Sequence, residues 1–259
     1  MKNKKIAPLH SGQPCVCAVC GGTTLRAFGQ KDFGVSCGDH FEGRRLYPDY
    51  GIQIPYFECD DCGLIIISAF DAWMPQDFAD HIYNADYALS DPPYLLERPL
   101  RNAHMIAALF HDQKESLRVL DFGGGNSAFA DALVSAGMDA SSFDPYGKGQ
   151  APVGTYDLIT CFEVLEHVVH HKLQAQLVEI AGHLKPGQGS KIFLSTQTAP
   201  MHGDTQGNIQ RDFGWWYISP RNGHVSMNTP KSLQILASRA GLQLASINTS
   251  MHVLSALAK

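Results

Sequence analysis

The strongest constraint on the fold is a glycine-rich turn between a predicted strand and a predicted helix. Val119 and Leu120 end a short apolar run typical of a buried strand, and residues 127–136 have the composition of a helix. Three consecutive glycines, Gly123 to Gly125, lie between them, where the backbone can turn tightly and approach a ligand. A strand, a glycine turn and a helix N-terminus together form nucleotide sites at the carboxyl edge of parallel sheets.

A second half of this site follows in the sequence. Residues 138–144 predict the next strand, and Asp144 ends it at the usual position of a carboxylate that binds ribose hydroxyls. The glycines also match the dinucleotide pattern G-x-G-x-x-A, so an NAD-dependent oxidoreductase is an alternative. Asp121 separates the two cofactors, because a carboxylate at the strand end would repel a pyrophosphate but attract the ammonium of S-adenosylmethionine. The residues therefore favour S-adenosylmethionine.

A second motif, YDLITCFEVLEHV at residues 156–168, predicts a strand that runs into polar residues and then a helix. Together the two motifs resemble the class I S-adenosylmethionine-dependent methyltransferases, in the subgroup with "LDFGxGxG" early and "FDLIxxxEVLEH" later. The resemblance covers about residues 95 to 259 and implies methyl transfer. It also implies that Asp121, Gly123 and Gly125 line the methionine end of the cofactor, Asp144 holds the ribose, and Phe162 and Glu163 close the pocket.

The chain departs from this subgroup at two points. Ser127 stands where the family has its third glycine, so the conformation of the turn is open. Few residues separate Asp144 from Tyr156, so the usual intervening helix and strand, with their adenine-contacting acid, are shortened or missing. Tyr146 lies in this short connection, and we assign it to packing against the adenine instead.

Two C-x-x-C-G sequences near the N-terminus predict a zinc ribbon. Cys17 and Cys20 belong to the first and Cys59 and Cys62 to the second, and four thiolates on two tight turns can surround Zn²⁺ tetrahedrally. Either of the two other cysteines of this region could replace one ligand, and reduced cysteines without metal are the alternative. Those two residues are Cys15 and Cys37. Many methyltransferases of the subgroup that the chain resembles carry a similar segment, which implies a structural or substrate-shaping role.

The order of predicted elements indicates an α/β fold. Alternating strands and helices followed by two closing strands predict a doubly wound, mostly parallel sheet with an antiparallel edge hairpin. A small zinc ribbon precedes this sheet. The predicted segments are a zinc ribbon over residues 1–70, a helical connector that could act as a lid over 71–112, and a methyltransferase domain over 113–259.

The long segment 197–228 has no clear periodicity but is too aromatic to be disordered. Long loops at the carboxyl edge of such a sheet are often functional, so we interpret this one as the substrate-binding wall. Its aromatic rings could stack on a sugar or ring, and its guanidinium could pair with a phosphate or carboxylate. The residues concerned are Trp215, Trp216, Tyr217 and Arg221. A packed cover without ligand contact is the alternative.

Methyl transfer is an in-line displacement, so the enzyme mainly aligns donor and acceptor. A base is needed only if the acceptor must lose a proton. His224, in the aromatic segment, is the first candidate base, and His167, after the second motif, is the next. For each, a structural histidine that bonds to the backbone is the alternative.

Composition limits the partners. The net charge of the 259 residues is −5, which does not support a broad nucleic-acid-binding surface. No apolar run approaches the length of a membrane span, and the basic N-terminus is not followed by an apolar signal region. We expect a cytoplasmic enzyme that methylates a small-molecule or sugar-linked acceptor. A non-catalytic module whose zinc ribbon binds RNA or protein is the remaining alternative.

Overall fold

The computed structural model describes residues 6–10, 12–145, 151–187, 189–203 and 209–257. Two compact units divide the chain. The first contains the residues up to Asp91, Glu166–His171 and Thr198–Ser232, and the second contains Pro92–Leu165, Lys172–Gln197 and the residues from Leu233 onward. These units do not follow the predicted boundaries at residues 70 and 112, because two later segments fold with the N-terminal residues.

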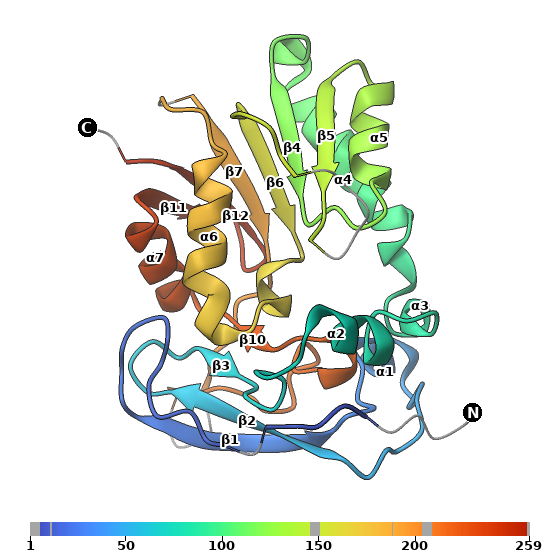
Figure 1. Cartoon of the computed structure of the whole chain (residues 1–259), viewed down its shortest axis with the longest axis vertical. Coiled ribbons are helices and arrows are strands. Elements are labelled where there is room, and N and C mark those ends of the chain that lie inside the picture. Colours follow the sequence, from blue (N-terminus) through green and yellow to red (C-terminus); the bar gives the residue numbers. More distant parts are fainter. Residues whose placement is uncertain (1–5, 11, 146–150, 188, 204–208, 258–259) are drawn as a thin grey trace. The chain divides into compact units, whose positions relative to one another are not determined.

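A six-stranded mixed sheet forms the centre of the second unit (Figure 1). Its strand order is β11-β12-β7-β6-β4-β5; the last four pair in parallel, and β12 and β11 are antiparallel at one edge. The α/β class and the antiparallel edge hairpin are therefore confirmed. The strands are β4 (Arg118–Phe122), β5 (Asp139–Phe143), β6 (Leu158–Phe162), β7 (Lys191–Ser195), β11 (Leu242–Ser246) and β12 (Met251–Ala256).

Strand β5 is the edge strand on the other side, and β6 is the next strand along the chain. The described residues between them contain no further helix or strand, which agrees with the predicted shortening after Asp144. Tyr146, which we assigned to the adenine, lies outside the described residues.

Helices α4 and α5 pack on this sheet through their apolar sides. Ile106 of α4 and Leu133 of α5 are fully buried in one cluster with Val119 of β4, which is the result expected from helical spacing of apolar residues. Helices α6 and α7 lie side by side, and Gln174 Nε2 donates to the carbonyl oxygen of Leu236 across 3.4 Å (Figure 1). The helices are η1 (Pro92–Tyr94), α4 (Glu97–Leu109), η2 (His111–Gln113), α5 (Ala128–Ser135), α6 (Leu173–Gly182) and α7 (Pro230–Arg239).

The first unit is built on a four-stranded antiparallel sheet with the order β1-β2-β3-β10. Strand β10 comes from the late segment and pairs with β3, where Ser226 stands opposite Ile66. The strands are β1 (Leu25–Asp32), β2 (Gln53–Cys59), β3 (Ile65–Ile66) and β10 (Ser226–Met227), with a separate pair β8 (His202–Gly203) and β9 (Ile209–Gln210). Short helices complete the unit: α1 (Cys37–Glu42), α2 (Pro75–His81), α3 (Tyr87–Ser90), η3 (Leu165–His167), η4 (His170–Lys172) and η5 (Pro220–Asn222).

The predicted connector, residues 71–112, contains α2, α3, η1 and α4 with turns between them. Tyr87 is buried, and its ring makes an edge contact with Tyr83 at 5.4 Å between centroids. None of the helices in the described part of the chain is both long and apolar enough to cross a membrane.

Candidate functional site

Asp121 is buried near the end of β4 and is held by two hydroxyl groups. Thr160 Oγ1 donates to one carboxylate oxygen across 3.2 Å, and Ser142 Oγ donates to the other across 3.4 Å. Burial raises the pKa of this carboxyl from 3.8 to about 7, against the lowering effect of the two hydroxyls, and the nearby Asp144 adds to the rise. The group therefore titrates near neutral pH and responds strongly to a cation placed beside it.

These hydroxyls occupy the positions that strand pairing dictates. Ser142 stands opposite Asp121 on β5, and Thr160 stands opposite it on β6. Sequence analysis missed both residues, although aligning the three strands at their carboxyl ends would have placed them beside the acid.

The glycine turn that follows β4 needs glycine at its first position. Gly123 has φ of +79°, and a Cβ there would lie 2.4 Å from Val164 Cγ2. Gly125 donates its N–H to Asp144 Oδ2 across 3.0 Å, so the turn and the acid after β5 are in contact. Ser127 adopts φ of 64°, the left-handed conformation that a glycine would take at the same place.

Glu163 follows β6 and is fixed by the end of β7. Its N–H donates to the carbonyl oxygen of Ser195 across 3.0 Å, and Ser195 Oγ donates to Glu163 Oε1 across 2.8 Å. Phe162 packs with its ring edge-on to Phe129, with 5.6 Å between centroids, and thus joins the hydrophobic core. Asp121, Asp144 and Glu163 lie at the ends of neighbouring parallel strands, at one edge of the sheet. Their contacts with a cofactor stay predictions.

Four cysteines of the first unit form a compact cluster. The sulfur atoms of Cys17 and Cys62 are 3.7 Å apart, and those of Cys20 and Cys59 are 3.5 Å apart. All four sulfurs lie within 4.8 Å of one another. These are the four residues that the C-x-x-C-G spacing predicted.

The two remaining cysteines of this region have other surroundings. Cys15 is exposed, and its thiol donates to the carbonyl oxygen of Gln13. Cys37 is buried, with its sulfur 3.8 Å from His224 Nδ1. The cluster in this structure is therefore made without them.

The two candidate bases lie together. The rings of His167 and His224 are 5.1 Å apart between centroids, and Glu166 lies beside them, with one donor atom of each residue within 4.8 Å of the others. His167 Nδ1 is 3.1 Å from the carbonyl oxygen of Gly223, and His224 Nδ1 is 2.7 Å from that of Tyr217. A carbonyl oxygen only accepts, so Nδ1 carries the proton in both rings and Nε2 holds the lone pair.

The aromatic segment is more buried than we expected of a substrate-binding wall. Tyr217 is 1% exposed, and its hydroxyl donates to Glu166 Oε1. Trp215 and Trp216 are half-buried, and the ring of Trp216 stacks on His40 with 6.2 Å between centroids. Substrate contacts of these rings stay predictions.

Arg221 occupies a structural position. Its side chain is 1% exposed and stacks over the ring of Tyr47 at 4.3 Å. The guanidinium donates to the carbonyl oxygen of Ile82 and to Asn84 Oδ1, across 2.7 and 3.1 Å. These contacts account for the burial of the Arg221 side chain inside the protein. Pairing of Arg221 with a phosphate or carboxylate of a substrate stays a prediction.

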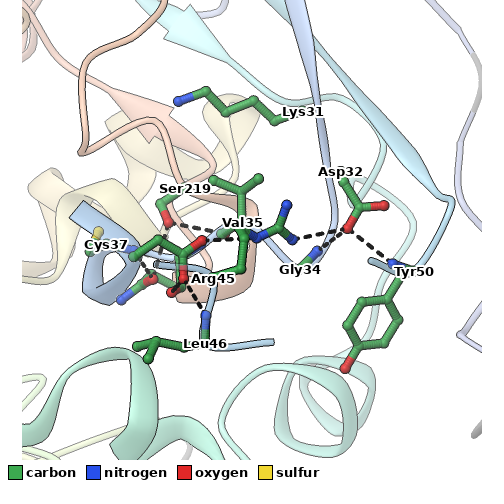
Figure 2. A network of polar contacts seen from close by, with 12 residues as sticks. Lys31, Asp32, Gly34, Val35, Cys37, Arg45, Leu46, Tyr50 and Ser219 are labelled. Atoms are coloured by element: carbon green, nitrogen blue, oxygen red, sulfur yellow. Dashed lines mark hydrogen bonds and ion pairs between the residues drawn. The ribbon is translucent and has the colours of Figure 1, made fainter. Parts of the chain in front are cut away.

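The loop after β1 anchors the segment that carries His224 (Figure 2). Ser219 Oγ and the Arg221 N–H both donate to the carbonyl oxygen of Val35, across 3.1 and 3.0 Å. The N–H of Cys37 donates to Asn222 Oδ1 across 2.8 Å. Arg45 braces the loop by pairing with two carboxylates, as Figure 2 shows for Asp32. The backbone that leads to His224 is therefore held in place by these hydrogen bonds.

Comparison with known proteins indicates a methyltransferase domain. Residues 94–247 match a protein-family model described as a methyltransferase domain. No curated protein is similar enough in sequence to match the chain.

Several solved structures resemble the chain. TnmH has a TM-score of 0.50 and 18% identity over 70% of this chain, which spans 61% of TnmH. The magnesium protoporphyrin IX methyltransferase ChlM from Synechocystis PCC 6803, with bound SAH, has a TM-score of 0.46 and 14% identity over 73% of this chain and 97% of its own. The mitomycin 7-O-methyltransferase MmcR has a TM-score of 0.46 and 14% identity over 62% of this chain and 55% of its own. At 18% identity, the likeness to TnmH indicates a shared fold.

Proposed function

Because this chain belongs to the methyltransferase domain family, we propose that it transfers the methyl group of S-adenosylmethionine and that its acceptor is a small molecule or a sugar-linked intermediate. The net charge of −5 disfavours a polyanionic substrate such as RNA. The half-buried rings of Trp215 and Trp216 offer flat apolar surfaces suited to a sugar or a ring system.

The observation that carries the cofactor assignment is the buried carboxylate beside the glycine turn. Asp121 would face the methionine ammonium, with Gly123 and Gly125 allowing the backbone to approach the cofactor. Asp144 would accept from the ribose hydroxyls in place of its present bond to Gly125. S-adenosylmethionine supplies the methyl group on a sulfonium, and the protein's task is to hold that carbon in line with the acceptor.

For an acceptor that must lose a proton, we propose His224 as the base and His167 as its alternative. Each ring uses Nδ1 to donate to a backbone carbonyl, which fixes its orientation and makes Nε2 the ring nitrogen that can accept a proton. His224 is 5% exposed, so its orientation is set by packing as well.

We further propose that Cys17, Cys20, Cys59 and Cys62 hold a structural Zn²⁺. Sulfur ligands at about 2.3 Å from a tetrahedral zinc lie roughly 3.8 Å apart, and the two measured pairs at 3.7 and 3.5 Å are close to this spacing. The cluster ties the turn before β1 to the end of β2, where Cys59 lies, and to the turn after it, where Cys62 lies. A structural role follows from this placement.

Calorimetric titration with S-adenosylhomocysteine, with NAD in a parallel run, tests the cofactor assignment. Saturable binding of the first and no binding of the second is the expected result, and the reverse would reinstate the oxidoreductase. Incubation with S-adenosylmethionine and a panel of hydroxylated, aminated and sugar-linked small molecules then tests turnover. Cofactor binding without any methylated product across such a panel would favour the non-catalytic alternative.

A further inference from the structure

We propose that Glu166, His167 and His224 bind a divalent first-row transition-metal cation, at a site separate from the cysteine cluster. One donor atom of each residue lies within 4.8 Å of the others, so the three residues are close enough to hold one ion. Two imidazoles and a carboxylate form a ligand set typical of Zn²⁺, Fe²⁺ and Co²⁺ sites that keep open positions. The four cysteines, by contrast, would form a closed thiolate site.

Both histidines have the outer hydrogen bonds that metal-binding imidazoles use. Metal-bound histidines usually donate their second ring N–H to a carbonyl or carboxylate, which fixes the ring and increases the basicity of the ligand nitrogen. His167 donates in this way to Gly223, and His224 donates to Tyr217. In each ring Nε2 is the nitrogen with a lone pair for the metal.

The carboxylate is also held in place. Glu166 is 0% exposed, and its Oε1 accepts from the hydroxyl of Tyr217. Its carbonyl oxygen accepts from the N–H of Val225 across 2.8 Å, which ties the segment of Glu166 and His167 to the segment of His224. Ser226 Oγ donates to the carbonyl oxygen of Val168 across 2.7 Å and reinforces the same connection. A divalent cation would offset the charge of a carboxylate removed from water.

This inference goes beyond methyl transfer, because metal binding here requires neither cofactor nor acceptor. A cation held by three protein ligands keeps positions for water or another oxygen ligand and lowers the pKa of a hydroxyl bound there. The role of His224 as the base then applies to the metal-free protein, and in the metal-loaded protein a hydroxide on the cation would remove the proton, because Nε2 of His224 cannot do both at once.

Cobalt binding to the purified full chain, after one equivalent of Zn²⁺ has filled the four-cysteine cluster and excess Zn²⁺ has been removed, tests the proposal. We expect wild type to bind an additional equivalent of Co²⁺ with visible d–d absorption and without a thiolate charge-transfer band. Glu166→Gln and His224→Ala should each weaken this binding at least about tenfold, the loss typical of disturbed metal ligation. His104→Ala, which removes an exposed histidine of α4, is the matched control and should bind as wild type does.

Two results would overturn the proposal. One is a Zn²⁺-loaded wild type that binds S-adenosylhomocysteine, and is therefore folded, but takes up no Co²⁺. The other is Co²⁺ uptake that survives Glu166→Gln and is lost in Asp71→Asn, which would assign the ion to the neighbouring group of Asp71, His170 and His171. Glu166→Gln keeps the size of the side chain and an oxygen that accepts from the Tyr217 hydroxyl. Its Co²⁺ affinity therefore still tests the proposal if the His224→Ala variant does not fold. Failure to bind S-adenosylhomocysteine with Co²⁺ uptake intact would count against the proposed function alone.

Discussion

At the scale of single residues, Asp121 combines two opposing properties. Its burial raises the pKa to about 7, so the folded protein favours the protonated carboxyl, whereas a bound ammonium would favour the ionised form. The unfolded chain ionises near the ordinary value of 3.8. The stabilising contribution of protonation is therefore fully present below that value and is lost as the pH rises through about 7.

Replacing Asp121 with Asn should separate the effect of the buried charge on stability from its effect on cofactor binding. Asn keeps an acceptor for Thr160 and removes the buried charge, so the Tm of the variant without ligand should exceed that of wild type by a larger margin at pH 8 than at pH 5. Affinity for S-adenosylhomocysteine should fall about 10- to 100-fold, the loss of one charged hydrogen bond. Thermal melts at both pH values and calorimetry provide the measurements. An equal Tm difference at both pH values, or unchanged affinity, would contradict the placement of the ligand.

Gly123→Ala should destabilise the fold, because alanine is strained at φ of +79° and its Cβ would meet Val164. We expect a loss of about 1–3 kcal/mol in the free energy of unfolding and much weaker binding of S-adenosylhomocysteine. Gly182→Ala at the end of α6 is the matched control, since a Cβ there meets nothing within 4 Å. That variant should be neutral or more stable by up to about 1 kcal/mol in urea unfolding. A Gly123→Ala protein as stable as wild type would show that the turn tolerates a side chain.

At the scale of elements, the start of α7 is defined by a hydroxyl. Thr229 Oγ1 accepts from the N–H of Ser232 across 3.0 Å, and Ser232 Oγ accepts from the N–H of Thr229 across 2.9 Å. Thr229→Ala should therefore cost about 0.5–2 kcal/mol of stability, and Thr229→Ser, which keeps the oxygen, should cost less. Urea unfolding of the pair checks this. Equal losses would mean that the methyl group, not the cap, matters.

The elements predicted well were those with local signals. The strand, glycine turn and helix now seen as β4, its following turn and α5 were visible in the sequence. The four cysteines and two glycines of the two C-x-x-C-G sequences were visible as well. In the structure the four predicted sulfur atoms lie close together. Strand β10 was not predicted, because two residues carry no periodicity and its pairing with β3 depends on residues far along the chain. For the same reason His224 could not be joined to Glu166 and His167 from sequence alone.

At the scale of the whole molecule, removal of the metal from the cysteine cluster should act on one unit. The four cysteines belong to the first unit, and the residues of the cofactor site belong to the second. With a strong chelator, amide exchange should rise in β1, β2 and β3, while binding of S-adenosylhomocysteine persists. Hydrogen exchange followed by mass spectrometry measures this, with re-addition of Zn²⁺ as the control. Exchange that rises equally in β4 and β6 would contradict it.

The pairing of β3 with β10 also has a consequence for synthesis on the ribosome. The isoleucine-rich strand β3 emerges early, but its partner is about 160 residues further on, a delay of roughly 10–30 s at typical translation speeds. During that interval the nascent chain presents an unsatisfied apolar edge, the kind of surface that invites aggregation. The cysteines emerge before the delay begins, so metal capture can precede sheet completion. A truncation at residue 91 would omit β10 for good, and chaperone dependence is expected of such a fragment rather than autonomous folding.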